Sequence, residues 1–130
     1  MTDELVWRLK ELDIIHREPV ELKHAGASGF YVDVKKAYGY PDVLNLISDA
    51  LMERIDRSTS CVATAGYGGL SPATVISSRH GLHLTLVRDQ QKKHGKGGWI
   101  DGYVPNEHDR ITIVDDVFTI DKERVKKILQ

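Results

Sequence analysis

The sequence predicts an α/β protein with a mainly parallel sheet, and three observations support this class. Segments with strand patterns alternate along the chain with segments that have helix patterns. Residues 111–114 (Ile-Thr-Ile-Val) form an unbroken apolar and β-branched run, which is typical of a strand covered on both faces. A glycine-rich turn joins the strand-like residues 61–65 to a helix-like segment. Such strand–turn–helix units imply right-handed crossovers between parallel strands.

The N-terminal third begins with a predicted amphipathic helix, for which Thr2 is a suitable N-cap. The apolar positions that follow at helical spacing are Leu5, Val6, Leu9 and Leu12. Small residues at 26–29 are expected to break the chain, and residues 30–34 to form a short strand.

A second helix begins at Pro41, since proline is favoured in the first turn of a helix. Its single apolar face consists of Val43, Leu44, Ile47, Ala50, Leu51 and Ile55. The remaining expected elements are a strand at 61–65, a helix at 72–78, strands at 82–87 and 110–116, and a final helix at 122–129.

Composition bounds the class of protein. The 130 residues, 41% of them hydrophobic, suit one globular domain. Eighteen basic and nineteen acidic residues leave a net charge of -1, which offers no electrostatic case for nucleic acid or an anionic membrane as partner. The lone cysteine, Cys61, is expected to be a buried, inert thiol. Without a basic N-terminal signal or an apolar run of ~20 residues, we expect a cytoplasmic protein.

Two adjacent carboxylates, Asp115 and Asp116, end the β-branched run. In open α/β sheets, ligands bind just beyond the carboxyl ends of the strands. Neighbouring carboxylates repel each other, so a polyol, an ammonium group or a divalent cation usually satisfies them. The alternative is an Asp-rich turn that caps the next helix.

The turn at residues 66–72 (Gly-Tyr-Gly-Gly-Leu-Ser-Pro) would let backbone N–H groups approach a phosphate or diphosphate at the positive end of a helix. Its spacing is neither that of a Walker loop nor that of a dinucleotide fingerprint. The glycines could equally serve backbone geometry alone.

Residues 88–98 form a polar, glycine-punctuated stretch that is rich in Arg, Lys and His. About twenty residues separate the strand before it from the next one, which is long for a structureless connection and favours a mobile functional loop. Its cations suit a polyphosphate leaving group. In the alternative, the stretch is a solvated basic hairpin, with Trp99, Ile100 and Tyr103 in one arm.

The segment at residues 23–33 combines small residues, which leave room for a flat ligand, with Phe30 and Tyr31, which could pack against its face or belong to the core. The histidines outside the basic stretch lack the spacing of metal ligands, so we do not expect a zinc site. They are His16, His80 and His83 among others.

Taken together, these segments resemble the type I phosphoribosyltransferases, and most of all those that act on orotate. Residues 111–119 are similar to the family's phosphoribosyl-diphosphate signature, and residues 87–98 to the catalytic loop of its orotate-specific members. Residues 23–33 resemble the N-terminal substrate segment and residues 66–72 the diphosphate turn. The resemblance covers roughly residues 5–119. It implies a Rossmann-like three-layer fold that is abbreviated at the C-terminus, in one domain with an N-terminal substrate segment (residues 1–38) and a core (39–130).

The resemblance also implies a reaction, in which phosphoribosyl passes from 5-phosphoribosyl 1-diphosphate to orotate and diphosphate is released. Asp115 and Asp116 would hold the ribose hydroxyls, directly or through Mg²⁺, and Thr119 would lie near the base. Arg88, Lys92 and His94 would close over the diphosphate as the catalytic residues. The remaining substrate-binding residues would be Lys23, Phe30, Tyr31, Gly66, Tyr67 and Gly68.

The sequence departs from the family at several positions. Residues 120–123 (Ile-Asp-Lys-Glu) stand where the family has a small, glycine-containing loop for the 5′-phosphate, and their acidic side chains would repel that group. The family has a lysine where Asp89 stands, and often one where Gly68 stands. Beyond Gln130 the family adds strands and helices, whose loss would expose a sheet edge unless another subunit covers it, so we expect a homodimer.

Two hypotheses follow. The first is an enzyme that transfers phosphoribosyl to orotate, which the basic loop favours. The second is a non-catalytic or regulatory relative that binds a nucleotide or sugar phosphate, which residues 120–123 favour.

Overall fold

A computed structural model describes residues 2–16, 20–22, 26–28, 31–93 and 98–116. In order, the elements of this part of the chain are α1 (Asp3–Glu11), β1 (Ile15–His16), β2 (Val20–Leu22), β3 (Gly26–Ser28), β4 (Tyr31–Val32), α2 (Val34–Ala37), α3 (Pro41–Arg54), β5 (Cys61–Ala65), α4 (Leu70–His80), β6 (His83–Lys92), β7 (Gly98–Gly102) and β8 (Ile111–Ile113).

A four-stranded sheet in the order β7-β6-β5-β8 forms the centre of the fold. Strand β5 is parallel to both of its neighbours, with Cys61 opposite His83 on one side and Ile111 on the other. Strands β6 and β7 are antiparallel. The predicted α/β class with a mainly parallel sheet is confirmed.

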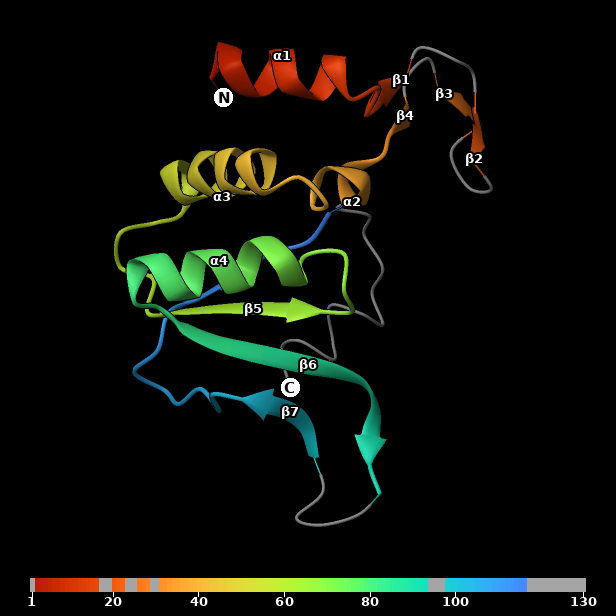
Figure 1. Ribbon diagram of the computed structural model, residues 1–130. Helices are drawn as coiled ribbons and strands as arrows, with labels where there is room; N and C mark the ends of the chain where they lie inside the picture. The colour runs from red at the N-terminus through yellow and green to blue at the C-terminus, as the bar shows by residue number, and fades with distance from the viewer. Residues whose placement is uncertain (1, 17–19, 23–25, 29–30, 94–97, 117–130) are drawn as a thin grey trace.

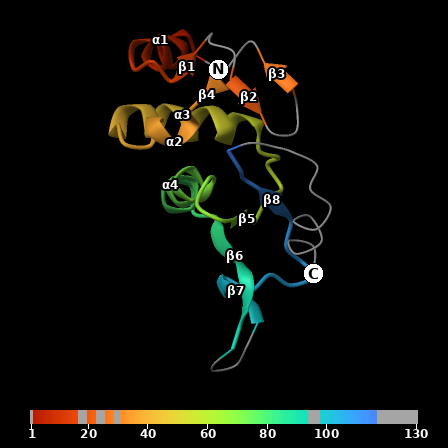
Figure 2. The same cartoon turned by 90° about the vertical axis from the view of Figure 1, so that its right-hand side faces the viewer.

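The helices are stacked in layers on this sheet (Figure 1). Helix α4 contacts β5 and β6, α3 packs on α4, and α1 packs on α3. Figure 2 shows α4 on one side of β5, with β8 toward the opposite side. Helix α3 therefore lies between the sheet-covering helix and the N-terminal helix.

Two apolar clusters hold these layers together, and α3 contributes to both. The buried residues of the first cluster, between α1, α2 and α3, are Leu5, Leu9, Ile14, Ala37 and Val43. Those of the second, between the helices and the sheet, are Val62, Ala73, Ile76 and Val114. Leu51 and Ile55, at the end of α3, pack against the second cluster.

Both predicted N-terminal helices are confirmed. The Thr2 side chain accepts a hydrogen bond from the Leu5 N–H at 3.3 Å, which caps α1. Pro41 occupies the first turn of α3. Strand β5 has the predicted bounds, whereas α4 begins at Leu70, two residues before the predicted start.

The region between α1 and α3 contains more structure than the sequence predicts. The expected chain break is wrong for Gly26–Ser28, which pairs with Val20–Leu22 as β3 of an antiparallel hairpin. The predicted strand at 30–34 is too long: β4 ends at Val32, because Asp33 begins α2 by accepting a hydrogen bond from the Lys36 N–H at 3.3 Å. Small residues have low strand propensity, so the partner strand decides this pairing.

Of the two alternatives for residues 88–98, a long loop and a hairpin, the structure has the hairpin. Strand β6 continues to Lys92 instead of ending at 87, and β7 returns antiparallel to it, so that only residues 93–97 separate the two strands. The hairpin alternative is therefore correct for Trp99 and Ile100 in β7, while Tyr103 lies just beyond that strand. Figure 1 shows this hairpin extending away from the helical layers.

Strand β8 is shorter and more exposed than predicted. It ends at Ile113, and Ile111 is 43% exposed although the β-branched run suggested burial on both faces. Of residues 111–114, only Val114, just after the strand, is buried. The reason is that β8 lies at the end of the strand order in the described sheet. The predicted helix at 122–129 lies outside the described residues.

Within the described ranges, none of the helices has the length and apolar character that crossing a membrane requires. The Cys61 thiol is buried as expected, and burial raises its pKa.

Candidate functional site

The turn between β5 and α4 supplies the first part of the site. Gly66 has a φ of 73°, a left-handed conformation that favours glycine. Gly69 is the N-cap of α4 and has no side chain to cap the helix. The first N–H groups of a helix have no intrahelical acceptor and carry the positive end of its dipole. The turn therefore presents a surface suited to an anion.

The chain after β8 supplies the second part. The Val114 N–H donates to the Ala63 carbonyl at 2.9 Å, which continues the parallel pairing to the end of β5. The next two residues are Asp115 and Asp116, and the Asp116 N–H donates to the Asp115 carboxylate at 2.9 Å. The carboxylates thus lie at the carboxyl edge of the sheet, as predicted.

The turn and the carboxylates are in direct contact, and glycine makes this contact possible. A Cβ added at Gly68 would lie 2.3 Å from an Asp116 carboxylate oxygen. A Cβ added at Gly69 would lie 2.2 Å from the Val114 carbonyl oxygen. The site therefore requires the absence of side chains at both positions.

Helix α2 brings a cation to the same place. The Lys35 ammonium lies 3.3 Å from an Asp116 carboxylate oxygen and 5.4 Å from the centre of the Tyr67 ring. The Asp116 side chain is only 17% exposed, so its charge is poorly hydrated. The ammonium offsets part of the repulsion between the two carboxylates.

Tyr38, at the end of α2, forms a hydrogen bond with the glycine turn. Its hydroxyl donates to the Gly68 carbonyl at 2.7 Å. Burial, together with the negative charges of Asp116 and Asp115, raises the pKa of Tyr38 to about 12. The hydroxyl therefore remains a hydrogen-bond donor throughout the neutral range.

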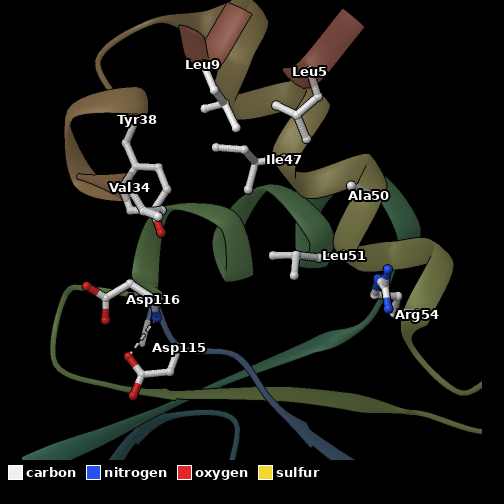
Figure 3. Close-up of a pocket in the computed structure, with 10 residues that line it drawn as sticks. All are labelled: Leu5, Leu9, Val34, Tyr38, Ile47, Ala50, Leu51, Arg54, Asp115 and Asp116. Carbon is white, nitrogen blue, oxygen red and sulfur yellow. Dashed lines mark hydrogen bonds between the residues drawn. The ribbon is translucent and has the colours of Figure 1, made fainter. Parts of the chain in front are cut away.

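A cavity of about 270 Å³ opens beside the carboxylates (Figure 3). It is lined by side chains of α1, α2 and α3 together with the two carboxylates: Leu5, Leu9, Val34, Tyr38, Ile47, Ala50, Leu51, Arg54, Asp115 and Asp116. Figure 3 shows Asp115 and Asp116 at one end and Arg54 at the other, with aliphatic side chains between them. Because most of this lining is apolar, we place an anionic ligand over the glycine turn and not within the cavity.

Two of the predicted catalytic residues, Arg88 and Lys92, lie on β6 of the β6–β7 hairpin. The Arg88 guanidinium forms an ion pair with the Asp101 carboxylate at 3.0 Å, across the hairpin. Lys92 is exposed at the end of β6. His94 lies outside the described residues. Arg88 is thus bound within its own hairpin, not to the carboxylates after β8.

The structure brings together five of the twelve predicted site residues: Gly66, Tyr67, Gly68, Asp115 and Asp116. Three others lie on β strands elsewhere, namely Arg88 and Lys92 on β6 and Tyr31 on β4. Lys23, Phe30, His94 and Thr119 lie outside the described residues.

Lys35 and Tyr38 contact the carboxylates and the glycine turn, and the sequence reasoning missed both. Lys35 and Tyr38 are three positions apart and follow the capping residue Asp33, a pattern that places two side chains on one helical face. Thr64, in β5, has a buried hydroxyl with no hydrogen-bond partner among the described residues. No sequence signal identifies that hydroxyl.

The carboxylates of Asp115 and Asp116 suit a magnesium ion that is also bound by substrate oxygens. Two adjacent carboxylates offer hard oxygen ligands, and Mg²⁺ is commonly held by one or two carboxylates together with substrate oxygens. Among the described residues, no group of three or more His, Cys, Asp or Glu side chains is arranged to hold a metal ion by itself. A metal here would therefore depend on the substrate for its remaining ligands.

Comparisons with known proteins identify relatives of this chain, although no model of a protein family matches it. The orotate phosphoribosyltransferase of Halobacterium salinarum is 29% identical over 127 residues, which cover 98% of this chain and 71% of the relative. That of Rhizobium etli is 28% identical over 121 residues, which cover 89% of this chain and 52% of the relative. The chain thus spans about half the length of some of these proteins.

The fold agrees with the sequence comparison. The crystal structure of orotate phosphoribosyltransferase from Aeropyrum pernix matches with a TM-score of 0.77 at 27% identity, over 96% of this chain and 71% of that one. In sequence and in fold, the chain is similar to orotate phosphoribosyltransferases, which have the type I phosphoribosyltransferase fold.

Proposed function

We propose that this chain, with its type I phosphoribosyltransferase fold, transfers a phosphoribosyl group from 5-phosphoribosyl 1-diphosphate to orotate. The observation that carries the proposal is the contact between the glycine turn at Gly68 and the carboxylate of Asp116. It brings an anion-binding surface next to two polyol-binding carboxylates. A sugar that carries both hydroxyls and a diphosphate is complementary to this pair of features.

In the proposed reaction, a ring nitrogen of orotate forms a bond to the anomeric carbon of the donor and releases its proton to the departing diphosphate or to water. The bond from that carbon to the diphosphate oxygen breaks, and diphosphate leaves with the electron pair. Orotidine 5′-phosphate is the other product. The transition state resembles an oxocarbenium ion with a growing negative charge on the leaving group, so the reaction needs electrostatic stabilisation more than a nucleophilic side chain.

The described residues would perform three tasks. Asp115 and Asp116 would bind the ribose hydroxyls, directly or through Mg²⁺, which would also neutralise diphosphate oxygens when bound. The backbone of residues 66–68 would bind the diphosphate at the start of α4. Arg88 and Lys92 would approach the diphosphate from the hairpin, together with His94, and would exclude water that could hydrolyse the donor.

Four further assignments rest on the resemblance in sequence. Lys23 would contact the substrate from the N-terminal segment (residues 1–38), and Phe30 and Tyr31 would pack on the flat base. Thr119 would lie near the same base. A homodimer and a cytoplasmic location also stay predictions, and sedimentation of the purified chain would test the first of them.

The second candidate function is a non-catalytic relative that binds a nucleotide or sugar phosphate. One structural observation favours it: Arg88 is bound to Asp101 within the hairpin, although catalysis would require its guanidinium at the diphosphate. The acidic sequence of residues 120–123 favours it as well.

An assay that measures the loss of orotate absorbance in the presence of donor and Mg²⁺ distinguishes the two functions. We expect turnover by the purified chain. His94→Ala should lose most of this turnover with little change in donor affinity, because His94 would act on charge that develops in the transition state. Asp116→Asn should weaken binding of both donor and Mg²⁺. Donor binding without turnover would support the second candidate, and the absence of both would reject the two functions together.

A further inference from the structure

Within the described part of the chain, Lys35 is a cation in direct contact with the proposed donor site. Its ammonium lies 3.3 Å from Asp116 and 5.4 Å from the Tyr67 ring centre, so it touches both the carboxylate region and the glycine turn. The side chain is 47% exposed, and its four-carbon stem allows the ammonium to move between partners. Lys35 comes from α2, an element that sequence reasoning did not connect with this site.

The position of Lys35 conflicts with a bound ligand at Asp116. A metal cation that binds this carboxylate would be repelled by the ammonium, which lies 3.3 Å from the Oδ2 atom of Asp116. The Asp116 carboxylate packs against the backbone at Gly68 and is only 17% exposed, so a bound cation and the ammonium would share a confined space. A bound metal cation would therefore favour movement of the ammonium away from Asp116.

The same ligand creates a new partner for the ammonium. Its diphosphate would lie on the turn that carries Tyr67, close to two carboxylates that repel it. A cation that moves from Asp116 toward the diphosphate would relieve this repulsion. The Tyr67 ring, which already lies beneath the ammonium, offers a surface along which it can move while it stays charged.

We propose that Lys35 is a ligand-exchanged counter-ion: it pairs with Asp116 in the free chain and with the diphosphate group of the donor in the complex. The identity of the donor rests on the proposed function, but the exchange concerns only binding. Lys35 should therefore have opposite effects on the affinities of the two kinds of ligand, because it competes with a metal cation for Asp116 and assists the binding of a diphosphate anion.

Calorimetry on the full chain with two simple probes tests this. With inorganic diphosphate in the absence of metal, Lys35→Met should bind about tenfold more weakly, the range expected for one charge-assisted contact. With magnesium chloride alone, Lys35→Met should bind Mg²⁺ more tightly, by roughly threefold, because the competing cation is gone. Lys35→Arg should restore diphosphate binding to within a few-fold of the unmodified chain.

Lys36→Met is the matched control, since Lys36 is the exposed neighbour on the same helix and the substitution removes the same charge. It should leave both affinities nearly unchanged. Thermal melts establish that each variant folds, and Lys35→Gln provides a second variant if Lys35→Met does not.

The sign of the two changes decides the outcome. A role limited to supporting the fold would weaken both probes in Lys35→Met, and this result would overturn the proposal. Equal diphosphate affinities in Lys35→Met and Lys36→Met, or the absence of diphosphate binding in the unmodified chain, would also overturn it. If the diphosphate and Mg²⁺ affinities of Lys35→Met shift in opposite directions but the unmodified chain does not turn over orotate, the exchange stands and the transferase function is rejected. If the chain turns over orotate but Lys35→Met and Lys36→Met have equal affinities, the transferase function stands and the exchange is rejected.

Discussion

The Tyr38 hydroxyl donates a 2.7 Å hydrogen bond to the Gly68 carbonyl and so joins α2 to the glycine turn across 30 positions of sequence. The carboxylate of Asp116 packs against the same glycine. One residue of the turn therefore contacts both the N-terminal segment and the chain that follows β8. The geometry of the proposed donor site depends on these contacts.

Tyr38 should make the fold sensitive to alkali. Its pKa is raised to about 12 in the folded chain, from an ordinary value of 10, so the folded state holds its proton more tightly than the unfolded state. Its contribution to stability is fully present below pH 10 and is lost as the pH rises through 12. Denaturant unfolding from pH 9 to 12 should show a steeper decline for the unmodified chain than for Tyr38→Phe. Tyr40→Phe, which leaves the bond to Gly68 intact, is the control.

Alanine substitutions at the two adjacent glycines should have different consequences. In Gly68→Ala the new Cβ meets a carboxylate, which can turn away, so donor affinity should fall about tenfold with little loss of stability. In Gly69→Ala the Cβ meets the Val114 backbone, which cannot turn away as a side chain can. The free energy of unfolding should therefore fall by about 1–3 kcal/mol.

Gly39→Ala is the control for both, because its Cβ would lie 3.4 Å from the nearest atom, the Lys36 carbonyl oxygen. Calorimetric titration and chemical denaturation measure the two effects separately. A Gly68→Ala variant that binds donor as tightly as Gly39→Ala would contradict the assigned contact with Asp116.

Two buried threonines should respond in opposite ways to replacement by valine. The Thr64 hydroxyl has no partner in the described part of the chain, so Thr64→Val should stabilise the fold by roughly 1 kcal/mol. The Thr85 hydroxyl donates to the Tyr103 carbonyl at 2.7 Å, so Thr85→Val should destabilise by about 1–2 kcal/mol. Thermal melts measure both. A destabilised Thr64→Val would indicate that an ordered water satisfies this hydroxyl.

Asp109 should contribute to stability down to low pH. The Asn106 N–H and the hydroxyls of Tyr103 and Ser60 donate to its carboxylate, which lowers its pKa to about 2. The lowered pKa stabilises the fold above the ordinary value of 3.8, and this contribution is lost as the pH falls through 2. Acid unfolding should therefore be less steep between pH 4 and 2 in Asp109→Asn. Tyr103→Phe removes one of the three donors and should show an intermediate slope.

The ion pair between Arg88 and Asp101 predicts that Asp101 and the diphosphate of the donor compete for the Arg88 guanidinium. If Arg88 serves the diphosphate, Asp101→Asn should release it and tighten donor binding by up to about fivefold, because a half-exposed pair contributes no more than ~1 kcal/mol. Arg88→Gln should lower turnover instead. Steady-state kinetics with varied donor measures both effects, and weaker donor binding in Asp101→Asn would show that the pair holds the hairpin in its active shape.

Sequence reasoning succeeded where a local pattern governs the structure. The apolar spacing in α1 and α3 and the unbroken run of β5 are such patterns, and their elements appear at or near the expected bounds. It failed where a partner decides. The sequence left a loop and a hairpin open for residues 88–98, and pairing with β7 makes residues 88–92 strand. Residues 26–28 were expected to break the chain, but pairing with β2 makes them β3.

The sequence by itself determined the α/β class, the glycine turn after β5 and the pair of carboxylates after β8, because each depends on residues that are adjacent along the chain. Only the tertiary structure showed that the turn and the carboxylates touch through Gly68, and that Lys35 and Tyr38 reach them from α2. These contacts join segments far apart in sequence. The packing of α1 and α2 on α3, and of α3 on α4 and the sheet, decides their geometry, and no local pattern specifies it.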